Sequence, residues 1–272
     1  MVSNETSDKT IDHYRLIKPL GDGTFGVGWL AEDMNTGDKI CVKIFHTMDK
    51  DTEESFRKEV SAGQQGLFHP NVLRLMGAGK SEIKKDGASN GKEVFYIVSE
   101  LACNGEAFDY VQMAEGLEAP YARLIFKQMV DAVGFVHSKG VAHRDLKLEN
   151  LFLGENCAVK LADFGLMKAF AGPMGEALTT QCGTENYMAP ELKGEQIPYA
   201  GPPVDIFAMG QMLFLMTYAK FAFSESTDIH YRRLMKNAAA AMKQKKIDCS
   251  PEFLDLFIGL IQQDPSKRIT IE

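Results

Sequence analysis

The stretch HRDLKLEN, residues 143–150, concentrates charged and polar side chains between two apolar segments. Asp145 could accept a proton from an attacking hydroxyl, Lys147 could neutralise a moving phosphoryl group, and Asn150 could offer an oxygen to a metal ion. Further along, Asp163 supplies a carboxylate suited to Mg²⁺, a hard cation that prefers oxygen ligands. Together these residues predict phosphoryl transfer, which depends chiefly on positioning and charge stabilisation.

Three glycines, Gly21, Gly23 and Gly26, form a G-x-G-x-x-G pattern between two strand-like runs. A backbone without Cβ atoms can close over phosphate oxygens and point N–H groups at them. Alone, the pattern also fits a glycine-rich turn or a dinucleotide-binding fold. The dinucleotide fold needs a helix after the glycines, whereas a strand-like run, a turn and another strand follow here. The sequence therefore favours a hairpin.

Lys43 lies in the apolar run ICVKIF. A lysine in such a strand either reaches solvent at a sheet edge or faces an interior anion, and one lysine does not decide between these. The helix expected after it carries Glu59, which could hold the ammonium while it contacts the phosphates of a nucleotide.

The composition is that of a soluble globular protein. The 272 residues are 45% apolar and 25% charged, with 30 basic and 37 acidic residues and a net charge of −7. This balance lacks the basic surplus of a nucleic-acid-binding protein and suits basic partners. The 5 cysteines form no C-x-x-C pair, which argues against a disulfide framework or zinc site and for a reducing compartment.

No segment predicts membrane attachment. The N-terminus lacks the apolar core of a signal peptide, and Val2 excludes the glycine that myristoylation requires. The apolar run at 206–223 raises a transmembrane interpretation, but it contains Gln211 and Lys220 and follows Asp205, so a helix buried in a globular lobe is the better prediction. We expect a cytoplasmic monomer, with the nucleus as the alternative location.

Two regions of different composition divide the chain. In the first hundred residues, short runs rich in β-branched and aromatic residues predict strands, and 51–66 predicts one helix capped by Asp51. Residues 80–93 lack an apolar pattern and predict a solvated loop. Helical patterns dominate from about Asn104 onward. A protein of two lobes is therefore expected.

The ordered motifs G-D-G-T-F-G, V-K, H-R-D-L-K-L-E-N, D-F-G and A-P-E resemble those of the eukaryotic protein kinases, from about Tyr14 to Arg268. The resemblance implies an α+β, bilobal protein-kinase-like fold, with a small β-rich N-lobe that has one main helix and a larger, mainly helical C-lobe. The implied parts are an N-terminal extension (1–13), a nucleotide-binding N-lobe (14–102) and a catalytic, substrate-binding C-lobe (103–272). The family continues for a further helix past Arg268, so the chain, which stops at Glu272, is expected to be truncated at its C-terminus.

The resemblance implies that the three glycines cover the phosphates of ATP and that Lys43 contacts the α- and β-phosphates with Glu59 as its partner. In the hinge, the Glu100 carbonyl and the Ala102 N–H would meet the adenine edge, and Glu106 the ribose. Ser99 would be the gatekeeper.

For catalysis, the resemblance makes Asp145 the base and has Lys147 assist the γ-phosphate. Asn150 and Asp163 would hold two magnesium ions. Lys147 together with Thr184 resembles the serine/threonine type, as in the calcium/calmodulin-dependent and AMP-activated branches, rather than tyrosine kinases.

Protein or peptide substrates with basic residues near the target Ser or Thr are expected, because Glu106 and Glu149 fall where basophilic kinases bind arginines. In the simpler alternative, Glu106 serves only the ribose and Glu149 only solvent. Thr180, or its neighbour Thr179, falls where related kinases are phosphorylated, by an upstream kinase or by themselves, and Arg144 would bind the phosphate. A constitutively ordered loop without phosphate is the alternative.

The sequence departs from the family pattern at several positions. Gly28 replaces a valine that packs on adenine, so apolar contact with the base is lost. An ungapped match would put Val60 in the place of Glu59. Gly63 replaces a bulky apolar residue, which predicts that its helix is mobile or needs help to dock. Structural roles are expected for Asp205, as anchor of the catalytic loop, and for an ion pair of Glu191 and Arg268.

Two other functions remain open. A pseudokinase would bind nucleotide and regulate partners by shape, but Lys43, Asp145, Asn150 and Asp163 are all present. A small-molecule phosphotransferase can share these residues but should lack the segment at 183–191 that forms a peptide platform.

Overall fold

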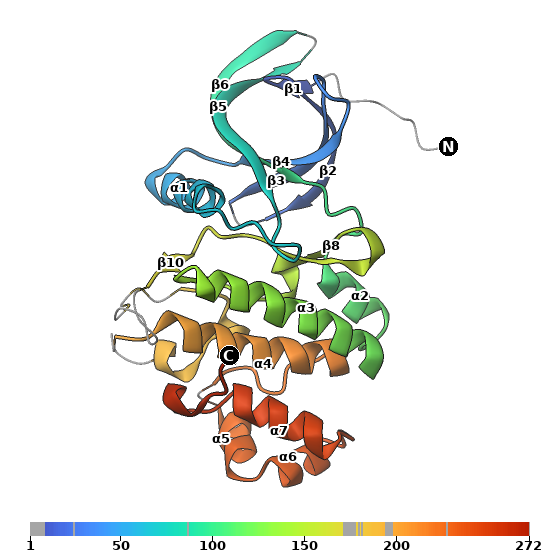
Figure 1. The fold of residues 1–272 in the computed structure, drawn as a ribbon, viewed down its shortest axis with the longest axis vertical. Helices are drawn as coiled ribbons and strands as arrows, with labels where there is room; N and C mark the ends of the chain where they lie inside the picture. The colour runs from blue at the N-terminus through green and yellow to red at the C-terminus, as the bar shows by residue number, and fades with distance from the viewer. Residues whose placement is uncertain are drawn as a thin grey trace.

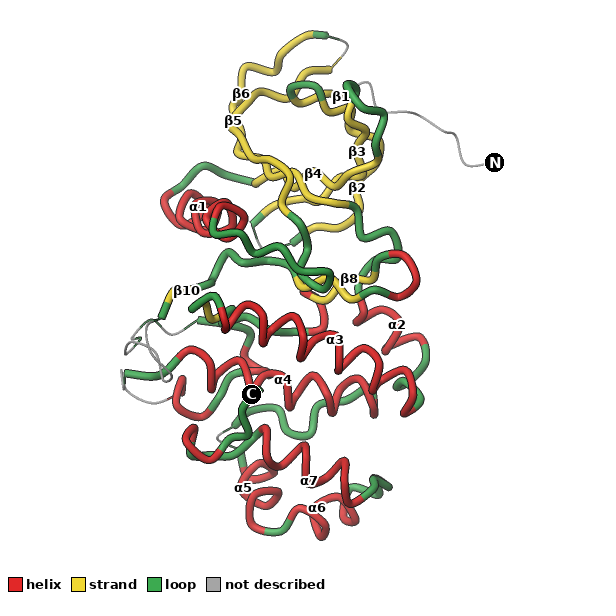
Figure 2. The backbone as a smooth tube through the Cα atoms, in the orientation of Figure 1, coloured by secondary structure: helices red, strands yellow, loops and turns green. Residues whose placement is uncertain are grey.

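The computed structural model describes residues 9–23, 25–85, 87–170, 178, 180, 182–193, 198–226 and 228–271. A strand-rich lobe, residues 9–100, stacks on a larger helical lobe, and the chain crosses between them once along the segment after residue 100 (Figure 1). Figure 2 shows strands confined almost entirely to the upper lobe and helices to the lower one, with a single helix beside the sheet.

The sheet of the N-lobe is antiparallel throughout, in the order β1-β2-β3-β4-β6-β5, and it curls so far that β1 also pairs with β5. Its interior is filled by apolar side chains that alternate along the strands, as the twofold period of a strand requires. β1 lies within the predicted N-terminal extension. The strands are β1 (Lys9–Ile11), β2 (Tyr14–Asp22), β3 (Gly26–Asp33), β4 (Lys39–Phe45), β5 (Leu75–Lys85) and β6 (Ala88–Glu100).

Strands β5 and β6 run through most of the segment at 80–93, so the prediction of a solvated loop there is wrong. Glu82 pairs with Glu93, and Lys85 with Ala88, so backbone pairing continues almost to the tip of the hairpin. Ile83 is the only apolar residue of β5 between Lys80 and Lys85, so this part of the sequence lacks the apolar alternation from which a strand is recognised.

Helix α1 (Lys50–Gln64) packs beside the sheet through Phe56, whose ring stacks on Phe95 at 4.6 Å and meets Phe45 edge-on at 5.6 Å. Its cap is Asp49, whose carboxylate accepts the Thr52 N–H at 2.9 Å, not Asp51 as predicted. The carboxylate at Asp49 satisfies one of the otherwise unpaired N–H groups of the first turn.

The C-lobe is built around α4, almost all of which is buried. The helices are α2 (Ala107–Met113), α3 (Ala119–Ser138), α4 (Gly201–Tyr218), α5 (Ile229–Lys236), α6 (Ala238–Gln244) and α7 (Pro251–Leu260). The C-lobe also contains two short antiparallel sheets of two strands each. β7 (Val141–Ala142) pairs with β10 (Lys168–Ala169), and β8 (Leu151–Leu153) forms a hairpin with β9 (Val159–Leu161).

Helix α4 confirms that the apolar run after Asp205 belongs, as far as Tyr218, to a buried helix of a globular lobe. Gln211 lies fully buried in its middle and donates to the carbonyls of Asn186 and Phe223 at 2.8 and 3.2 Å. Over the residues that the structure describes, no helix combines the length and apolarity needed to cross a bilayer.

Five single-turn 3₁₀ helices complete the described fold. Their ranges are Leu148–Asn150, Glu155–Cys157, Glu185–Tyr187, Pro190–Lys193 and Pro265–Lys267. The first of these follows directly on the polar cluster at 143–147 and turns Asn150 back toward it.

Candidate active site

A cavity of about 750 Å³ lies between the two lobes, with the sheet above it and the loops of the C-lobe below. Its walls include all the predicted site residues except Asp145, whose carboxylate is bonded to the lining residues Lys147 and Thr184. From the N-lobe and hinge come Gly21, Gly23, Gly26, Lys43, Glu59, Glu100 and Ala102, and from the C-lobe come Glu106, Lys147, Asn150 and Asp163. Residues far apart in the sequence are therefore gathered around one space large enough for a nucleotide.

The three glycines differ in what they allow. A Cβ atom at Gly26 would lie 2.3 Å from the Ile44 carbonyl oxygen, so only glycine permits the close approach of β3 and β4 there. A Cβ at Gly21 would meet nothing within 4 Å, and one at Gly23 would lie 3.6 Å from the Gly26 carbonyl oxygen. Gly21 and Gly23 thus leave open space at the mouth of the cavity, whereas Gly26 is required by the sheet itself.

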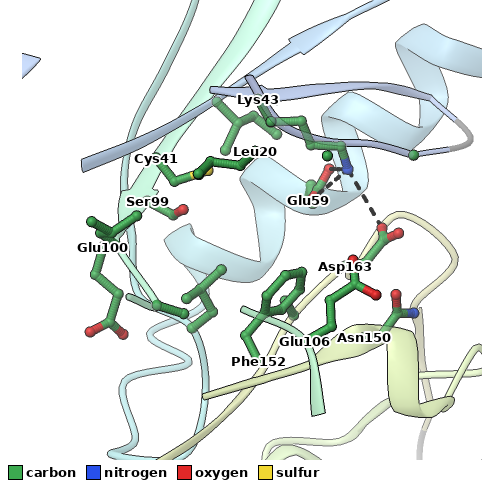
Figure 3. A pocket seen from close by; sticks show the side chains of 18 of the residues that line it. Leu20, Cys41, Lys43, Glu59, Ser99, Glu100, Glu106, Asn150, Phe152 and Asp163 are labelled. Carbon is green, nitrogen blue, oxygen red and sulfur yellow. Dashed lines mark hydrogen bonds and ion pairs between the residues drawn. The ribbon is translucent and has the colours of Figure 1, made fainter. Parts of the chain in front are cut away.

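Lys43 faces the cavity, not solvent, and pairs with Glu59 of α1 (Figure 3). Its Nζ lies 3.1 and 2.9 Å from the two carboxylate oxygens of Glu59, and 3.7 Å from Oδ1 of Asp163 in the C-lobe. Burial alone would lower the pKa of Lys43, but the two carboxylates outweigh it and raise the pKa to about 12. The ammonium therefore stays charged at neutral pH and links the lobes.

Glu59, not Val60, carries the carboxylate that meets Lys43. The pairing requires α1 to lie close to the sheet, and Gly63 makes this possible. A Cβ atom at Gly63 would lie 2.3 Å from Cδ2 of Leu75, so the Leu75 side chain fills the space that a larger residue at position 63 would take. From Gly63 the sequence predicts a helix that is mobile or needs help to dock, and in the structure Leu75 of β5 packs against α1 at this position.

Asp145 is 9% exposed, and its carboxylate accepts from Lys147, Thr184 and, at 3.4 Å, Asn150. Lys147 Nζ lies 2.8 Å from Asp145 Oδ2, and the Thr184 hydroxyl donates to Oδ1 at 3.0 Å. Lys147 also donates to the Thr184 hydroxyl at 3.1 Å, so Asp145, Lys147 and Thr184 are all bonded to one another. Asn150 donates through Nδ2 to the Asp145 carbonyl at 2.9 Å, which leaves its amide oxygen for another partner.

The backbone of this loop is anchored from below by Asp205, which is 1% exposed. Its carboxylate accepts the N–H groups of His143 and Arg144, each at 2.8 Å, which confirms its predicted anchoring role. Arg144 has a φ of 70° and Asp163 a φ of 63°, a left-handed conformation that is strained for side chains other than glycine. Asp205 therefore holds the strained turn at Arg144 beside the cavity.

The loops that carry Asp145 and Asp163 are joined through His143, whose Nε2 lies 2.9 Å from the Ala162 carbonyl oxygen. Burial acts to raise the pKa of Asp163, but the charges of Lys43 and His143 hold it below its ordinary value. Asp163 is therefore ionised at neutral pH.

The hinge end of the cavity includes residues that the sequence argument missed. Cys41 lies two residues before Lys43 on β4, and therefore on the same face of the strand, with its sulfur 3.8 Å from where a Cβ at Gly28 would lie. The Cys41 thiol therefore fills part of the space that a side chain at position 28 would occupy. Phe152 of β8 lines the C-lobe side of the cavity.

Acidic side chains gather where the cavity opens beside α2. Burial raises the pKa of Glu106, and the nearby charges of Asp109 and Glu149 raise it further. Glu149 also accepts a hydrogen bond from the buried Tyr187 hydroxyl at 3.0 Å. The alternative in which Glu149 meets only solvent is therefore wrong.

The Thr180 carbonyl oxygen accepts from Arg144 Nη2 at 3.1 Å and from the Tyr199 hydroxyl at 2.8 Å. The Arg144 guanidinium also contacts the Cys182 sulfur, while its buried Nε has no hydrogen-bond partner among the described residues. Thr180 itself is exposed, and Thr179 lies outside the described residues.

The predicted ion pair of Glu191 and Arg268 is confirmed, with both nitrogen–oxygen distances at 2.6 Å. The ion pair connects the 3₁₀ helix that contains Glu191 to the first turn of α4, because Arg268 also donates to the Pro203 carbonyl at 2.7 Å.

A β-rich lobe and a helical lobe, enclosing a cavity with a glycine hairpin, a lysine–glutamate pair and two loop aspartates, define the bilobal kinase class. The chain belongs to the protein kinase domain family, whose model matches residues 14–272. This confirms the predicted α+β, bilobal kinase fold.

Named relatives agree with this assignment. The carbon catabolite-derepressing protein kinases of Candida glabrata and Saccharomyces cerevisiae are 33% and 34% identical over 99% and 96% of this chain. The maternal embryonic leucine zipper kinase of Xenopus tropicalis is 32% identical over 97%. The chain spans only 42%, 39% and 38% of the length of these proteins, respectively.

Proposed function

We propose that this chain is an ATP-dependent protein serine/threonine kinase. The observation that carries the proposal is the geometry of Asp145, a nearly buried carboxylate held by Lys147 and Thr184 at the edge of a nucleotide-sized cavity. The substrate hydroxyl would give its proton to Asp145 as its oxygen bonds to the γ-phosphorus. The bond from that phosphorus to the β,γ-bridging oxygen breaks, and ADP leaves.

Lys43, kept charged by Glu59 and Asp163, would bind the α- and β-phosphates, and Lys147 the transferred group. Asn150 and Asp163 offer an amide oxygen and a carboxylate, which fit Mg²⁺, a cation commonly bound by one or two carboxylates together with phosphates and water. Bound Mg²⁺ would neutralise phosphate charge. The hinge backbone at Glu100 and Ala102 would hold the adenine, and Glu106 the ribose.

Substrates with basic residues near the target Ser or Thr are proposed from the group of Glu106, Asp109 and Glu149. The negative charges of Asp109 and Glu149 raise the pKa of Glu106, which means that the three carboxylates repel one another. A cation bound among them would relieve this repulsion. A guanidinium from a substrate fits this place because it can pair with two carboxylates at once.

Phosphorylation of Thr180 is proposed as an activating step, by an upstream kinase or by the chain itself. The buried Arg144 Nε without a described partner and the exposed Thr180 lie in the same small region. A phosphate on Thr180 would give Arg144 an anionic partner and order the segment.

The test is transfer of labelled phosphate from Mg²⁺-ATP to matched peptides that contain Ser, Thr or Tyr, each with and without an upstream Arg. The expected result is transfer to Ser and Thr, greatest with the Arg, and loss of transfer in Asp145→Asn while nucleotide still binds. Binding without transfer, even after treatment with an activating kinase, would identify a pseudokinase. Transfer to small alcohols but not to peptides would identify a small-molecule phosphotransferase.

A further inference from the structure

Glu100 ends β6 at the start of the hinge, and its carboxylate points away from Lys43 and Asp163 (Figure 3). Both of its oxygens lie 3.0 Å from Nζ of Lys160, the middle residue of β9 in the C-lobe. The side chains of Lys160 and Glu100 are only 17% and 27% exposed. We call this contact the hinge ion pair.

The same carboxylate is tied to the N-lobe. Glu100 Oε1 accepts the Arg74 N–H at 2.8 Å, and the Glu100 N–H donates to the Arg74 carbonyl at 3.0 Å. Arg74 immediately precedes β5, and Glu100 also pairs with Ile40 of β4. One carboxylate therefore joins the ends of N-lobe strands to a lysine of the C-lobe at the point where the chain crosses between lobes.

The C-lobe side of the hinge ion pair is firmly placed. Lys160 pairs with Phe152 in the β8–β9 hairpin, and Phe152 lines the cavity and forms a bridge with Glu106. The neighbouring Leu161 exchanges backbone hydrogen bonds of 2.8 Å with Leu73 and Asn71. The backbone of the strand that carries Lys160 is thus fixed beside the floor of the nucleotide cavity, and its bonds to Leu73 and Asn71 tie it to the segment before β5.

We propose that Lys160 is a positioning residue for nucleotide binding. Lys160 holds the Glu100 carboxylate and thereby fixes the hinge backbone relative to Phe152 in the cavity floor. This backbone, at Glu100 and the residues after it, would face the adenine. The inference rests on the proposed nucleotide site. Without the ion pair, the hinge backbone has more freedom, and nucleotide binding must first remove that freedom.

The test uses Lys160→Met, which keeps most of the side-chain stem but removes the charge, and Glu100→Gln, which can still accept the Arg74 N–H. For a partly buried ion pair, we expect each variant to weaken nucleotide affinity by about three- to tenfold, measured by titration with a fluorescent ATP analogue. The KM for ATP should rise in parallel, while kcat stays within about twofold. Lys127→Met, which removes a lysine paired within α3, is the matched control and should bind as the wild type does.

A double-mutant cycle separates a shared role from two independent ones. If the hinge ion pair acts as proposed, Glu100→Gln with Lys160→Met loses no more affinity than either single variant. Amide hydrogen exchange over 100–105 should be faster in both single variants without nucleotide, a readout that stands even if the chain transfers no phosphate. Unchanged affinity, additive losses or unchanged exchange would overturn the inference, whereas failure of the wild type to bind nucleotide would overturn the proposed function.

Discussion

The C-lobe half of the cavity is held by hydrogen bonds from backbone groups to one buried carboxylate, whereas the N-lobe half is held by an ion pair and by the packing of a helix. Asp205 anchors the loop of Asp145 through two N–H groups that cannot rotate away. Lys43 depends on Glu59, and therefore on where α1 lies. The position of Asp145 therefore depends on backbone hydrogen bonds within one lobe, whereas the position of Lys43 depends on how one helix packs on the sheet.

The largest loss of stability is expected in the C-lobe half, from Asp205→Ala. The change leaves the His143 and Arg144 N–H groups buried without an acceptor, so we expect the free energy of unfolding to fall by about 3–5 kcal/mol. Chemical denaturation checks the loss. Asp131→Ala, at a half-exposed residue of α3, is the control and should stay within about 0.5 kcal/mol of the wild type. Equal effects of the two changes would contradict the anchoring role.

In the N-lobe half of the cavity, Gly63→Leu should change the position of α1. The new side chain overlaps Leu75, so α1 must move away from β5, and we expect a loss of about 1–3 kcal/mol in stability together with a larger loss of phosphate transfer. Adding Leu75→Ala makes room and should restore transfer in part. A Gly63→Leu variant with full activity would show that the helix does not depend on this contact.

The stabilisation that Asp205 provides should depend on pH. Burial acts to raise the pKa of Asp205, but the hydrogen bond and charge of His137, with His143 and the Arg144 N–H, hold it below its ordinary value. Because the folded-state pKa is lowered, its stabilisation is complete above the unfolded-state pKa of about 3.9 and is lost as the pH falls through the folded-state value.

The stability difference between the wild type and Asp205→Asn should therefore be constant from pH 7 to about pH 5 and shrink in more acidic solution. Denaturation at a series of pH values measures it. A difference that grows toward acid would contradict the sign of this pKa shift.

The smallest effect is expected at the join between the catalytic loop and the peptide-facing segment. Tyr187→Phe removes the hydroxyl that donates to Glu149, and the stability should fall by about 0.5–1.5 kcal/mol. The KM for an Arg-containing peptide should change less than it does in Glu149→Gln, because the carboxylate remains. Peptide kinetics with both variants check this ranking.

The sequence predicted best what chemistry constrains locally. Asp145, Lys147 and Asn150 lie within one short loop, so their types and spacing indicate a shared task before any fold is known. Glu59 was harder to assign than Lys43, because the register of a helix relative to a strand is decided by packing, here by Gly63 and Leu75. Position 63 alone gave no sign that a residue of β5 would fill the gap.

Other features were missed because their partners are distant or their pattern is weak. Lys160 is an isolated lysine in a short strand, and its partner Glu100 is 60 residues away in the sequence. The β5–β6 hairpin has polar residues on both faces near its tip, so no alternation marks it as a strand. Asp49 and Asp51 are equally plausible caps by type, and only the backbone conformation at position 49 selects between them.

The pairing of β1 has a consequence for how shortened forms of this protein should be designed. A fragment begun at Tyr14, where the family match starts, would lack Ile11, which is fully buried, and would leave the backbone groups of β2 and β5 that meet β1 open to solvent. Exposed strand edges attract other chains. Recombinant fragments that retain residues 9–13 should therefore stay dispersed at concentrations where those starting at Tyr14 precipitate.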